Sequence, residues 1–576
     1  MKNFLFLFIT GALLVVFPSS ALTCTTMLIT KGATKDGSVL VSHSDDDSIE
    51  DRRVIFVPAM DHKPGSMRPV YYDTAALGFK PEYTPTYNKR YVGKSRGPGY
   101  SEPGLPLSKP LGAIPQVAHT YAYFDGNYGI MNEHQLGIGE CTNGAKVEPE
   151  PDPGKRIFYS AELSRVALER CKKAREAVRL MGELIEQYGY YGTGETLLVA
   201  DTEEGWVFEM CGYDEKGTGG LWVAKKVPDG EVFVAANEFR IREIEPDDPD
   251  TMYSKNLFEA VREKGWWSPE DGKLDWLKAV SNGEYSHPYY SLRRVWRAMS
   301  RMAPSMKLPA WVEDGFTRAY PFSIKPEKPL AVADVISLHR DHYEGTEFDM
   351  RKGLAAGPHG SPNRYPGPYD KSEIGTKAQK MRGAWERPLS IFRCGYVYVN
   401  QLRGFLPSPV GGVCWFGNDR PYETCLVPFY AGVNSIPDSF SKGDIWRFDR
   451  NTALWAFNFV ANYADLNYSH MIKDIQSRQA AIEDEQYAVQ PAVEQAAMAL
   501  YKNGKVDLCK KYLTNYCSFN ADRVVKEWWA LAEELIVKYN DGYLVVRGRP
   551  EQKIGYPDWW LEKAGYFKGP TTYRKP

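Results

Sequence analysis

The sequence predicts an α+β fold in which antiparallel sheets stack between layers of helices, followed by a mainly helical C-terminal region. Three observations lead to this class. Short β-branched runs in the first half of the chain are joined by sharp Asn/Gly and Asp-Gly turns, which is the pattern of β-hairpins. A long amphipathic helix interrupts these strands, and helical periodicity returns after residue 453.

The first segment has the pattern of an export leader. Lys2 precedes an almost continuously apolar run over 4–17, and small residues follow it. This run is shorter than the roughly 20 residues of a membrane span and is typical of a secretion signal. We therefore expect 1–23 to be a signal peptide or propeptide, cut after Ala21 or after Thr23, and the protein to be secreted or periplasmic.

The next elements are strands. Residues 25–29 and 38–42 are expected to pair as a hairpin whose turn contains Asp36-Gly37. Residues 61–115 are rich in Pro, Gly and Tyr and are expected to form a long ordered loop over the core. Further strands are expected at 117–123, 129–131, 136–140, 195–200, 205–210, 221–225 and 232–236.

Helices separate and follow these strands. One helix is predicted over 159–188, where apolar residues recur at helical spacing with Glu, Lys and Arg between them. Strands return at 389–399, 411–416 and 424–428, the pattern over 453–539 is helical, and the tail is short strand or coil. We therefore expect a first domain over 24–445 and a mainly helical region over 446–576 packed on it.

Composition excludes several classes of partner. The chain has 576 residues, of which 43% are hydrophobic and 25% charged, as in an ordinary globular protein. Its net charge of −2 gives no support for binding nucleic acid or an anionic membrane surface. No stable membrane span is expected, and the sequence leaves open whether the protein is a monomer or a homo-oligomer.

Cysteine usage fits export. Apart from Cys24 there are eight cysteines, an even number that is compatible with disulfides in an exported chain. We expect one or two disulfides at most. Cys509 with Cys517 and Cys414 with Cys425 are close enough in sequence to pair.

Cys24 follows the predicted leader, so processing can make it the first residue of the mature chain. It would then carry a thiol and a free α-amine, a nucleophile with a base beside it. Since the usual pKa values are about 8.5 for the thiol and about 7.7–8.0 for the amine, the amine can take the thiol proton near neutral pH. A disulfide-bonded Cys24 is the alternative. A lipid anchor is disfavoured because the preceding residues lack the Leu-small-small pattern.

Several segments form an ordered set over about residues 24–470. They are Cys24-Thr25-Thr26, the run Ser42-His43-Ser44-Asp45-Asp46, and the segments 128–140, 162–170, 340–349, 352–358, 427–432 and 455–462. Together they resemble peptidase family C69, dipeptidases of the N-terminal-nucleophile (Ntn) hydrolase superfamily. The resemblance implies a four-layer αββα sandwich. It also implies hydrolysis of short peptides, typically dipeptides, without a metal or organic cofactor.

The resemblance also implies a set of site residues. Related Ntn hydrolases orient the nucleophile with an Arg and an Asp and hold the oxyanion with side-chain amides. Asn132 and Asn237 match the amides, and Asp46 matches the Asp. A later arginine near the nucleophile would come from Arg293 or Arg294, of which Arg294 is preferred. The expected catalytic residues are therefore Cys24, Asp46, Asn132, Asn237 and Arg294. Each of the last four also has a purely structural interpretation, as a turn residue, a helix cap or a salt-bridge arginine.

Substrate-binding candidates come from the same segments. His43 stands where the family often has an arginine, so the first orienting contact departs from the pattern. His43, Glu133 and Glu140 are the expected substrate-binding residues, and the C-terminal helices are expected to cap the groove and restrict substrates to short peptides.

Other chemistries have weaker support. His339 and His342 are donor types for zinc, but the order His-Glu-x-x-His of a metalloprotease helix is missing, and no metal is expected. No serine elbow, Walker loop or dinucleotide fingerprint is present. Two alternatives stay open: an Ntn amidase or acyltransferase acting on non-peptide amides, and a non-catalytic exported binding protein with an unprocessed N-terminus.

Overall fold

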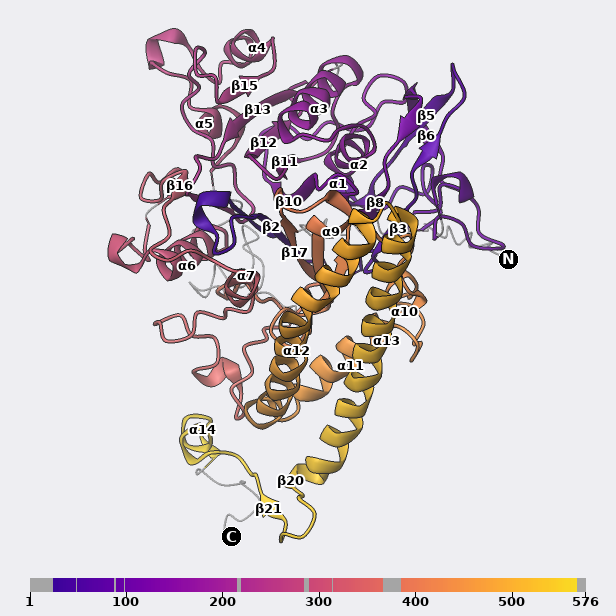
Figure 1. Ribbon diagram of the computed structural model, residues 1–576. Coiled ribbons are helices and arrows are strands. Elements are labelled where there is room, and N and C mark those ends of the chain that lie inside the picture. Colours follow the sequence, from indigo (N-terminus) through magenta and orange to yellow (C-terminus); the bar gives the residue numbers. More distant parts are fainter. Residues whose placement is uncertain are drawn as a thin grey trace, which may run out of the picture.

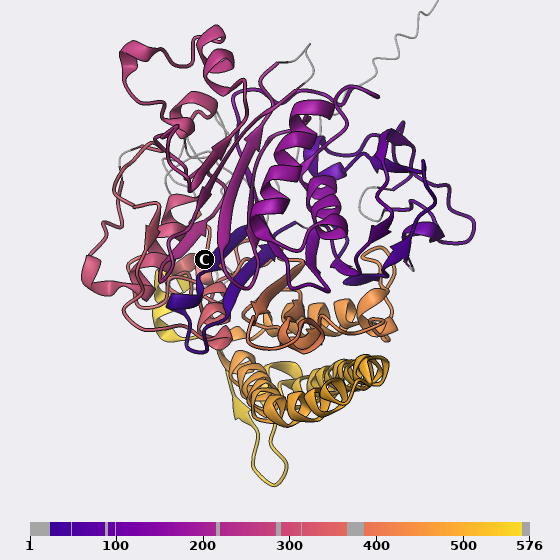
Figure 2. The same ribbon diagram turned by 45° about the horizontal axis from the view of Figure 1, so that its top comes forward.

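Two antiparallel sheets pack face to face between layers of helices in the computed structural model (Figures 1 and 2). The structure describes residues 24–47, 49–86, 90–97, 99–214, 219–283, 290–312, 314–365 and 385–566. The predicted leader over 1–23 lies outside these residues. The predicted four-layer αββα arrangement is confirmed, because each sheet buries one face against the other sheet and the opposite face against helices.

The first sheet has β1 and β2 at its centre, and each is antiparallel to both of its neighbours. The hairpin predicted over 25–42 is therefore present. In order across the sheet, its seven strands are β16 (Ser323–Ile324), β14 (Val232–Ala235), β1 (Thr25–Ile29), β2 (Val39–Asp45), β17 (Tyr396–Leu402), β18 (Val413–Asn418) and β19 (Val427–Tyr430).

The second sheet is built almost entirely from the stretch between residues 120 and 255. Its core is a meander, since β10 to β13 pair in sequence order. In order across the sheet, its eight strands are β15 (Thr251–Tyr253), β13 (Leu221–Lys226), β12 (Gly205–Cys211), β11 (Gly194–Ala200), β10 (Gly137–Asn143), β9 (Gly129–Asn132), β8 (Tyr123–Asp125) and β3 (Ile55–Val57).

The sheets touch where β1 and β2 lie over β10 and β11. The sheets approach closely at Gly139, because a Cβ atom at this position would lie 2.5 Å from Thr26 Oγ1. Across the same interface the Tyr398 hydroxyl donates to Ile138 O at 2.7 Å. A side chain at residue 139 would therefore push β10 away from β1 and β2.

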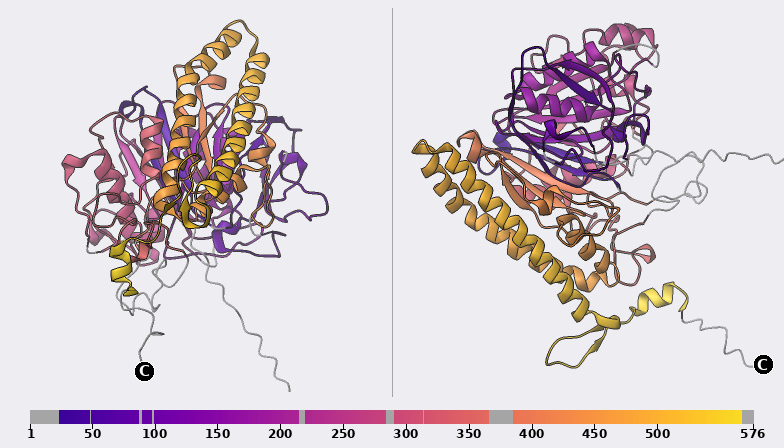
Figure 3. Two further views of the ribbon diagram at one scale, coloured as in Figure 1. Left: turned by 90° about the horizontal axis from the view of Figure 1, so that it is seen from below. Right: turned by 90° about the vertical axis from the view of Figure 1, so that its right-hand side faces the viewer.

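Helices cover the outer faces. α2 (Ser160–Arg170) and α3 (Ala174–Tyr188) lie on the second sheet, whereas α6 (Leu292–Met302), α7 (Val332–His339), α11 (Ala453–Ala464) and α13 (Val506–Lys538) contact the first. α12 (Tyr468–Lys502) packs along α13, and Figure 3 shows the pair as a long hairpin on the outside of the strands. The helical pattern predicted over 453–539 thus corresponds to three helices.

The single helix predicted over 159–188 is wrong at one point. The chain leaves helical geometry at Cys171 (φ −114°, ψ 149°) and starts again at Ala174. Asp201 accepts a hydrogen bond from Ala174 N at 3.0 Å, so a carboxylate from a distant loop caps α3. The apolar spacing continues across this break, which explains why the sequence predicts one helix.

The predicted loop over 61–115 contains regular structure. β4 (Met60–Asp61) pairs with β7 (His119–Thr120), β5 (Met67–Tyr71) pairs with β6 (Pro110–Pro115), and α1 (Thr74–Leu77) follows β5. β6 begins and ends with proline, which lacks the amide donor of a ladder and is confined to sheet edges. Its proline content therefore concealed a strand.

All nine cysteines are free and buried, so the expected disulfides are wrong. Cys509 and Cys517 lie on α13, about 12 Å apart along the axis at 1.5 Å per residue, which is beyond disulfide reach. Cys414 lies within β18, and Cys425 precedes β19. Proximity in sequence therefore did not indicate pairing.

Smaller elements complete the fold. They are α4 (Leu257–Glu263), α5 (Trp276–Val280), α9 (Ser408–Gly411), α10 (Asp438–Ser441), α14 (Asp558–Lys563), and a terminal hairpin of β20 (Tyr543–Leu544) and β21 (Gln552–Lys553). Among the described residues, no helix combines the length and the apolar character needed to cross a membrane.

Candidate active site

Cys24 lies at the amino end of β1, between the carboxyl ends of two antiparallel neighbours. The register places Ser44 of β2 opposite Thr25 and Ala235 of β14 opposite Thr26. The residues that end or follow β2 and β14 therefore flank Cys24 from both sides. Segments more than 200 residues apart in the sequence meet at this point.

Arg294 on α6 holds the backbone at Cys24. Its Nη1 donates to Cys24 O and to Thr25 Oγ1, both at 2.8 Å. Its Nη2 donates to Asn237 Oδ1 at 2.7 Å, and its Nε donates to Tyr290 O at 2.8 Å. The rigid guanidinium fork thus fixes the position of Cys24 relative to the side-chain amide of Asn237.

Asn237 follows β14 in the left-handed region, with φ 68°, a conformation that Asn adopts more readily than most residues. Its Oδ1 accepts hydrogen bonds from Arg294 and Arg387, which sets the amide orientation. Its Nδ2 donates one hydrogen to Thr142 O at 2.7 Å. No partner among the described residues is assigned to the second hydrogen, which is the type of donor that an oxyanion needs.

Asp46 and Arg387 form a buried ion pair beside this amide. Arg387 Nη2 donates to Asp46 Oδ2 at 2.7 Å, and its Nη1 donates to Asn237 Oδ1 at 3.0 Å. Burial raises the pKa of Asp46, and the charges of Arg387 and Arg294 oppose that rise. Sequence reasoning missed Arg387, because nothing in the string Trp385-Glu386-Arg387-Pro388 distinguishes it from a surface arginine.

The second sheet contributes residues from β10. Cys24 Sγ, a ring nitrogen of His43 and a carboxylate oxygen of Glu140 all lie within 4.8 Å of one another. His43 Nδ1 is 2.8 Å from Glu140 O, and Cys24 Sγ donates to Asp45 Oδ1 at 3.9 Å. Cys141 Sγ contacts Cys24 O at 3.7 Å. All five of these residues are fully buried.

Negative groups dominate the surroundings of the thiol. Burial, followed by the charges of Glu140 and Asp45, raises the pKa of Cys24 well above its usual value. Burial also raises the pKa of Asp45 and of Glu140. The pKa of Glu195 is raised by burial and by Glu140 beside it, so this carboxyl pair retains a proton. Burial lowers the pKa of His43 to about 4, which keeps its imidazole neutral.

Two predicted residues lie elsewhere. Asn132 Nδ2 donates to Leu168 O at 2.9 Å and to Cys171 O at 2.8 Å, at the end of α2. Its Oδ1 accepts two backbone amides of its own turn. With every amide group engaged, Asn132 has no hydrogen left for an oxyanion, and the catalytic role predicted for it is corrected to that of a structural anchor.

Glu133 is the second correction. Its carboxylate accepts a hydrogen bond from Ala122 N at 2.9 Å and pairs with Lys510 of α13 at 3.5 Å. It therefore ties the C-terminal helices to the body and is not among the residues around Cys24. α12 and α13 themselves contact β19, α9, α10 and α11, none of which supplies a residue to the Cys24 cluster described above.

The two histidines weighed as zinc donors contact different partners. His339 Nε2 lies 2.8 Å from Ser42 Oγ, whereas His342 Nδ1 lies 3.2 Å from Glu344. They therefore do not converge on one point.

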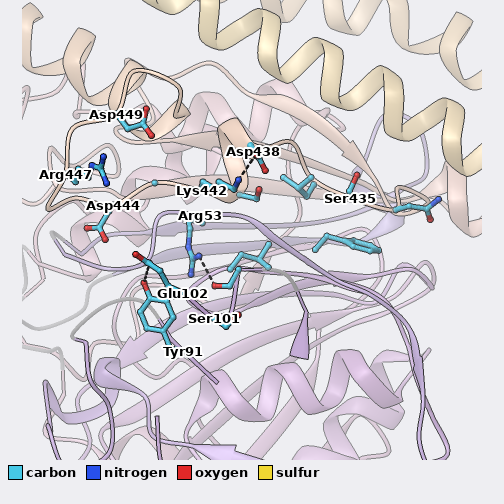
Figure 4. A pocket seen from close by; sticks show the side chains of 17 residues that line it. Arg53, Tyr91, Ser101, Glu102, Ser435, Asp438, Lys442, Asp444, Arg447 and Asp449 are labelled. Atoms are coloured by element: carbon cyan, nitrogen blue, oxygen red, sulfur yellow. Dashed lines mark hydrogen bonds and ion pairs between the residues drawn. The ribbon is translucent and has the colours of Figure 1, made fainter. Parts of the chain in front are cut away.

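A polar cavity of about 660 Å³ lies between the segments 53–102 and 434–449 (Figure 4). Lys442 pairs with Asp438 at 2.6 Å and Tyr91 donates to Glu102 at 2.8 Å. These groups already satisfy one another. None of the residues that line the cavity belongs to the Cys24 cluster, so the cavity is a separate feature of the surface.

One family model and several known proteins are similar to this chain. The model of peptidase family C69 matches residues 23–481. A probable dipeptidase of Salmonella dublin is 26% identical over 438 residues, which are 74% of this chain and 84% of that protein. A probable dipeptidase of Latilactobacillus sakei is 25% identical over 433 residues, 73% of this chain and 76% of that protein. Among solved structures, penicillin V acylase from Agrobacterium tumefaciens gives a TM-score of 0.28 at 11% identity, covering 71% of this chain and 86% of that one.

Proposed function

The chain belongs to peptidase family C69 and is a hydrolase of peptide bonds, and from this premise we propose that it is a dipeptidase whose nucleophile is Cys24, exposed as the first residue by processing. One observation carries the proposal. Cys24 lies at the amino end of β1, between the carboxyl ends of β2 and β14. Arg294 Nη1 donates to Cys24 O at 2.8 Å. Cys24 is also the second residue of the region that the family model matches, residues 23–481.

The proposed reaction has two stages. The α-amine of Cys24 takes the thiol proton, and the thiolate attacks the carbonyl carbon of the scissile peptide bond. The carbonyl oxygen becomes an oxyanion, and the second hydrogen of Asn237 Nδ2 is the donor proposed for it. Collapse breaks the C–N bond, the leaving amine receives the proton from the α-ammonium, and a thioester remains. Water then hydrolyses the thioester by the same proton path and restores the thiol.

Arg294 and Arg387 have positioning roles in this scheme. Arg294 holds the Cys24 carbonyl and the Asn237 amide, and Arg387 holds the same amide and Asp46. The geometry is therefore set before the substrate arrives, which is what makes oxyanion donors effective.

The carboxyls around Cys24 support a substrate with a free ammonium group. Glu140 and Asp45 are fully buried next to the thiol, and no lysine or arginine makes a hydrogen bond or ion pair with either carboxylate among the described contacts. A substrate α-ammonium would supply the missing positive charge, and His43 would line the same space. We further propose that the enzyme acts outside the cytoplasm, since the apolar run over 4–17 has the features of a secretion signal.

The test begins with the N-terminal residue of the protein secreted by its host, determined by intact mass and Edman sequencing. We expect Cys24. Dipeptide hydrolysis is then measured for the wild type, for Cys24→Ser and for Cys171→Ser, a control that alters another buried thiol at the end of α2. We expect Cys24→Ser to lose about 10³-fold or more in kcat, as nucleophile variants do, and the control to keep its activity.

Three results would contradict the proposal. A mature chain that starts at Leu22 has no catalytic α-amine at Cys24. Activity that is indifferent to Cys24→Ser would remove the nucleophile. Hydrolysis of non-peptide amides without hydrolysis of any dipeptide on the panel would favour an amidase instead.

A further inference from the structure

The Cys24 cluster contains a set of donors that peptide hydrolysis by a thiol and an amine does not require. Cys24 precedes β1, His43 lies on β2 and Glu140 lies on β10, and their donor atoms lie within 4.8 Å of one another. Both sheets contribute, so the core of the sandwich fixes the separation of these atoms.

The donor types match one class of metal ion. Thiolate, imidazole and carboxylate are the protein ligands of Zn²⁺, at bond lengths of about 2.0–2.3 Å. Tetrahedral coordination at these lengths separates ligand atoms by roughly 3.3–3.8 Å. One pair in the cluster, His43 Nδ1 and Glu140 Oε2, lies 3.9 Å apart. Hard cations such as Mg²⁺ prefer all-oxygen sites and do not suit this set.

The imidazole is already oriented. His43 Nδ1 lies 2.8 Å from Glu140 O, 3.3 Å from Glu140 N and 3.9 Å from Glu140 Oε2. The contact with the carbonyl is of the type that fixes the ring of a metal-bound histidine. Its Nε2 has no hydrogen-bond partner among the described residues. When Nδ1 donates to that carbonyl, Nε2 carries the free lone pair.

The local charge also favours a cation. Asp45 Oδ1 lies 3.9 Å from Cys24 Sγ, and the Glu140–Glu195 pair adds further carboxyl groups to the same buried region. A dication placed among these carboxyl groups would interact favourably with each of them.

We propose that Cys24, His43 and Glu140 bind one Zn²⁺ ion, and that this ion blocks the nucleophile reversibly. On binding, the S–H bond of Cys24 breaks, a Zn–S bond forms, and the proton passes to solvent, so affinity rises with pH. The α-amine of Cys24 supplies a fourth donor by closing a five-membered chelate ring with Sγ. Only this fourth donor rests on the proposed processing; the three side chains are present in either form of the chain.

The test uses Co²⁺ as a spectroscopic probe of the same site and Zn²⁺ as its competitor. Metal-free protein, isolated after chelation, is titrated with Co²⁺. We expect one equivalent to give a thiolate-to-cobalt charge-transfer band and the intense visible bands of tetrahedral coordination, and Zn²⁺ to remove both. Isothermal titration with Zn²⁺ gives the affinity independently of any activity assay.

Variants assign the ligands. Cys24→Ser is expected to abolish the charge-transfer band, whereas Cys141→Ser, which alters the neighbouring thiol, is expected to retain it. His43→Ala is expected to weaken Zn²⁺ binding by more than about 10-fold, since loss of even an outer-shell partner costs that much. His134→Ala, which removes a part-buried imidazole outside the cluster, is the control and should bind Zn²⁺ like the wild type. Unfolding midpoints show whether each variant is folded.

The outcomes are separable from those of the dipeptidase test. A wild-type protein without a charge-transfer band overturns the zinc proposal, and so does a band that persists in Cys24→Ser or disappears in Cys141→Ser. A mature chain that starts upstream of Cys24 contradicts the processing but leaves the same titration valid for the three side chains. Zinc inhibition of hydrolysis that a chelator reverses, with a band that follows Cys24, supports the proposal.

Discussion

The ion pair between Arg387 and Asp46 offers the sharpest test of how the site is positioned. The Arg387 side chain is 4% exposed and the Asp46 side chain is fully buried. Arg387→Ala leaves the Asp46 carboxylate without its 2.7 Å partner and removes one of two arginines from the Asn237 amide. Removing one member of a buried pair typically costs about 3–5 kcal/mol, so we expect a loss of that size in the free energy of unfolding.

The catalytic effect is expected to be smaller than the loss of a complete oxyanion donor, which is about 10²–10³-fold. Arg294 still holds Asn237 Oδ1 at 2.7 Å in the variant. We therefore expect kcat to fall by about 10–10²-fold, with KM changed less. Arg387→Lys should recover part of the stability by keeping a positive charge near Asp46, but not kcat, because one ammonium cannot reproduce the bridging fork.

Urea unfolding and steady-state dipeptide kinetics measure these effects. Adding Asp46→Asn to Arg387→Ala removes the buried carboxylate charge that Arg387 faced, so the double variant should be more stable than Arg387→Ala alone. Arg297→Ala, which breaks a 2.8 Å pair with Asp341 outside the site, is the control and should keep wild-type kcat. If the double variant is no more stable than Arg387→Ala, or if Arg387→Ala keeps wild-type kcat, the positioning argument is refuted.

Three further predictions follow from the described contacts. Asn237→Ala should lower kcat by about 10²–10³-fold with little change in KM. Asn132→Ala should instead cost about 1–3 kcal/mol of stability, because it leaves buried carbonyls unpaired, without a comparable loss of kcat. Steady-state kinetics and urea unfolding distinguish the two variants. Burial raises the pKa of Glu209 to about 8, so the folded state holds a proton that the unfolded state has lost, and stability falls as pH rises from about 4.5 to 8. Glu209→Gln should reduce this dependence of stability on pH. If the unfolding curves of the variant at pH 5 and pH 8 differ as much as those of the wild type, the prediction is wrong. Deleting 480–576 removes the buried face of α13, including Trp528, so we expect loss of the folded state on gel filtration and circular dichroism, not a folded enzyme that accepts longer peptides.

The fold was accessible from the sequence wherever apolar runs end at glycine or polar turns. The strand predicted over 25–29 is β1, and that over 205–210 lies within β12 (Gly205–Cys211). The prediction failed where local chemistry was ambiguous, as at the strand predicted over 389–399, which begins at Tyr396. The run over 389–399 includes Ser390, Arg393 and Gly395 among apolar residues and does not specify where pairing with a distant strand starts, because pairing with β2 sets the register.

The site was only partly accessible, for a related reason. Asn132 ends β9 and Asn237 follows β14 by two residues, and nothing in either local sequence tells which of them lies near Cys24. The pairing of β14 with β1 brings Asn237 to Cys24, whereas the Asn132 amide donates to carbonyls at the end of α2. Arg387 lies far along the chain from every other site residue, so its role emerges only when β17 pairs with β2 and brings the segment before β17 to Asp46.

The charge around Cys24 ties the proposed processing to the chemistry. Asp45, Glu140 and Glu195 are buried carboxyls whose pKa values are raised by burial, and Glu140 further raises the pKa of Asp45 and of Glu195. The cluster therefore holds protons for want of positive partners. While Cys24 is joined to a preceding residue, its backbone brings no charge, and burial together with Glu140 and Asp45 raises the pKa of its thiol. Cleavage before Cys24 would add an α-ammonium beside these groups. In its protonated form this group would let a carboxyl ionise, and in its neutral form it would accept the thiol proton. One cleavage would therefore supply both the base and its electrostatic environment.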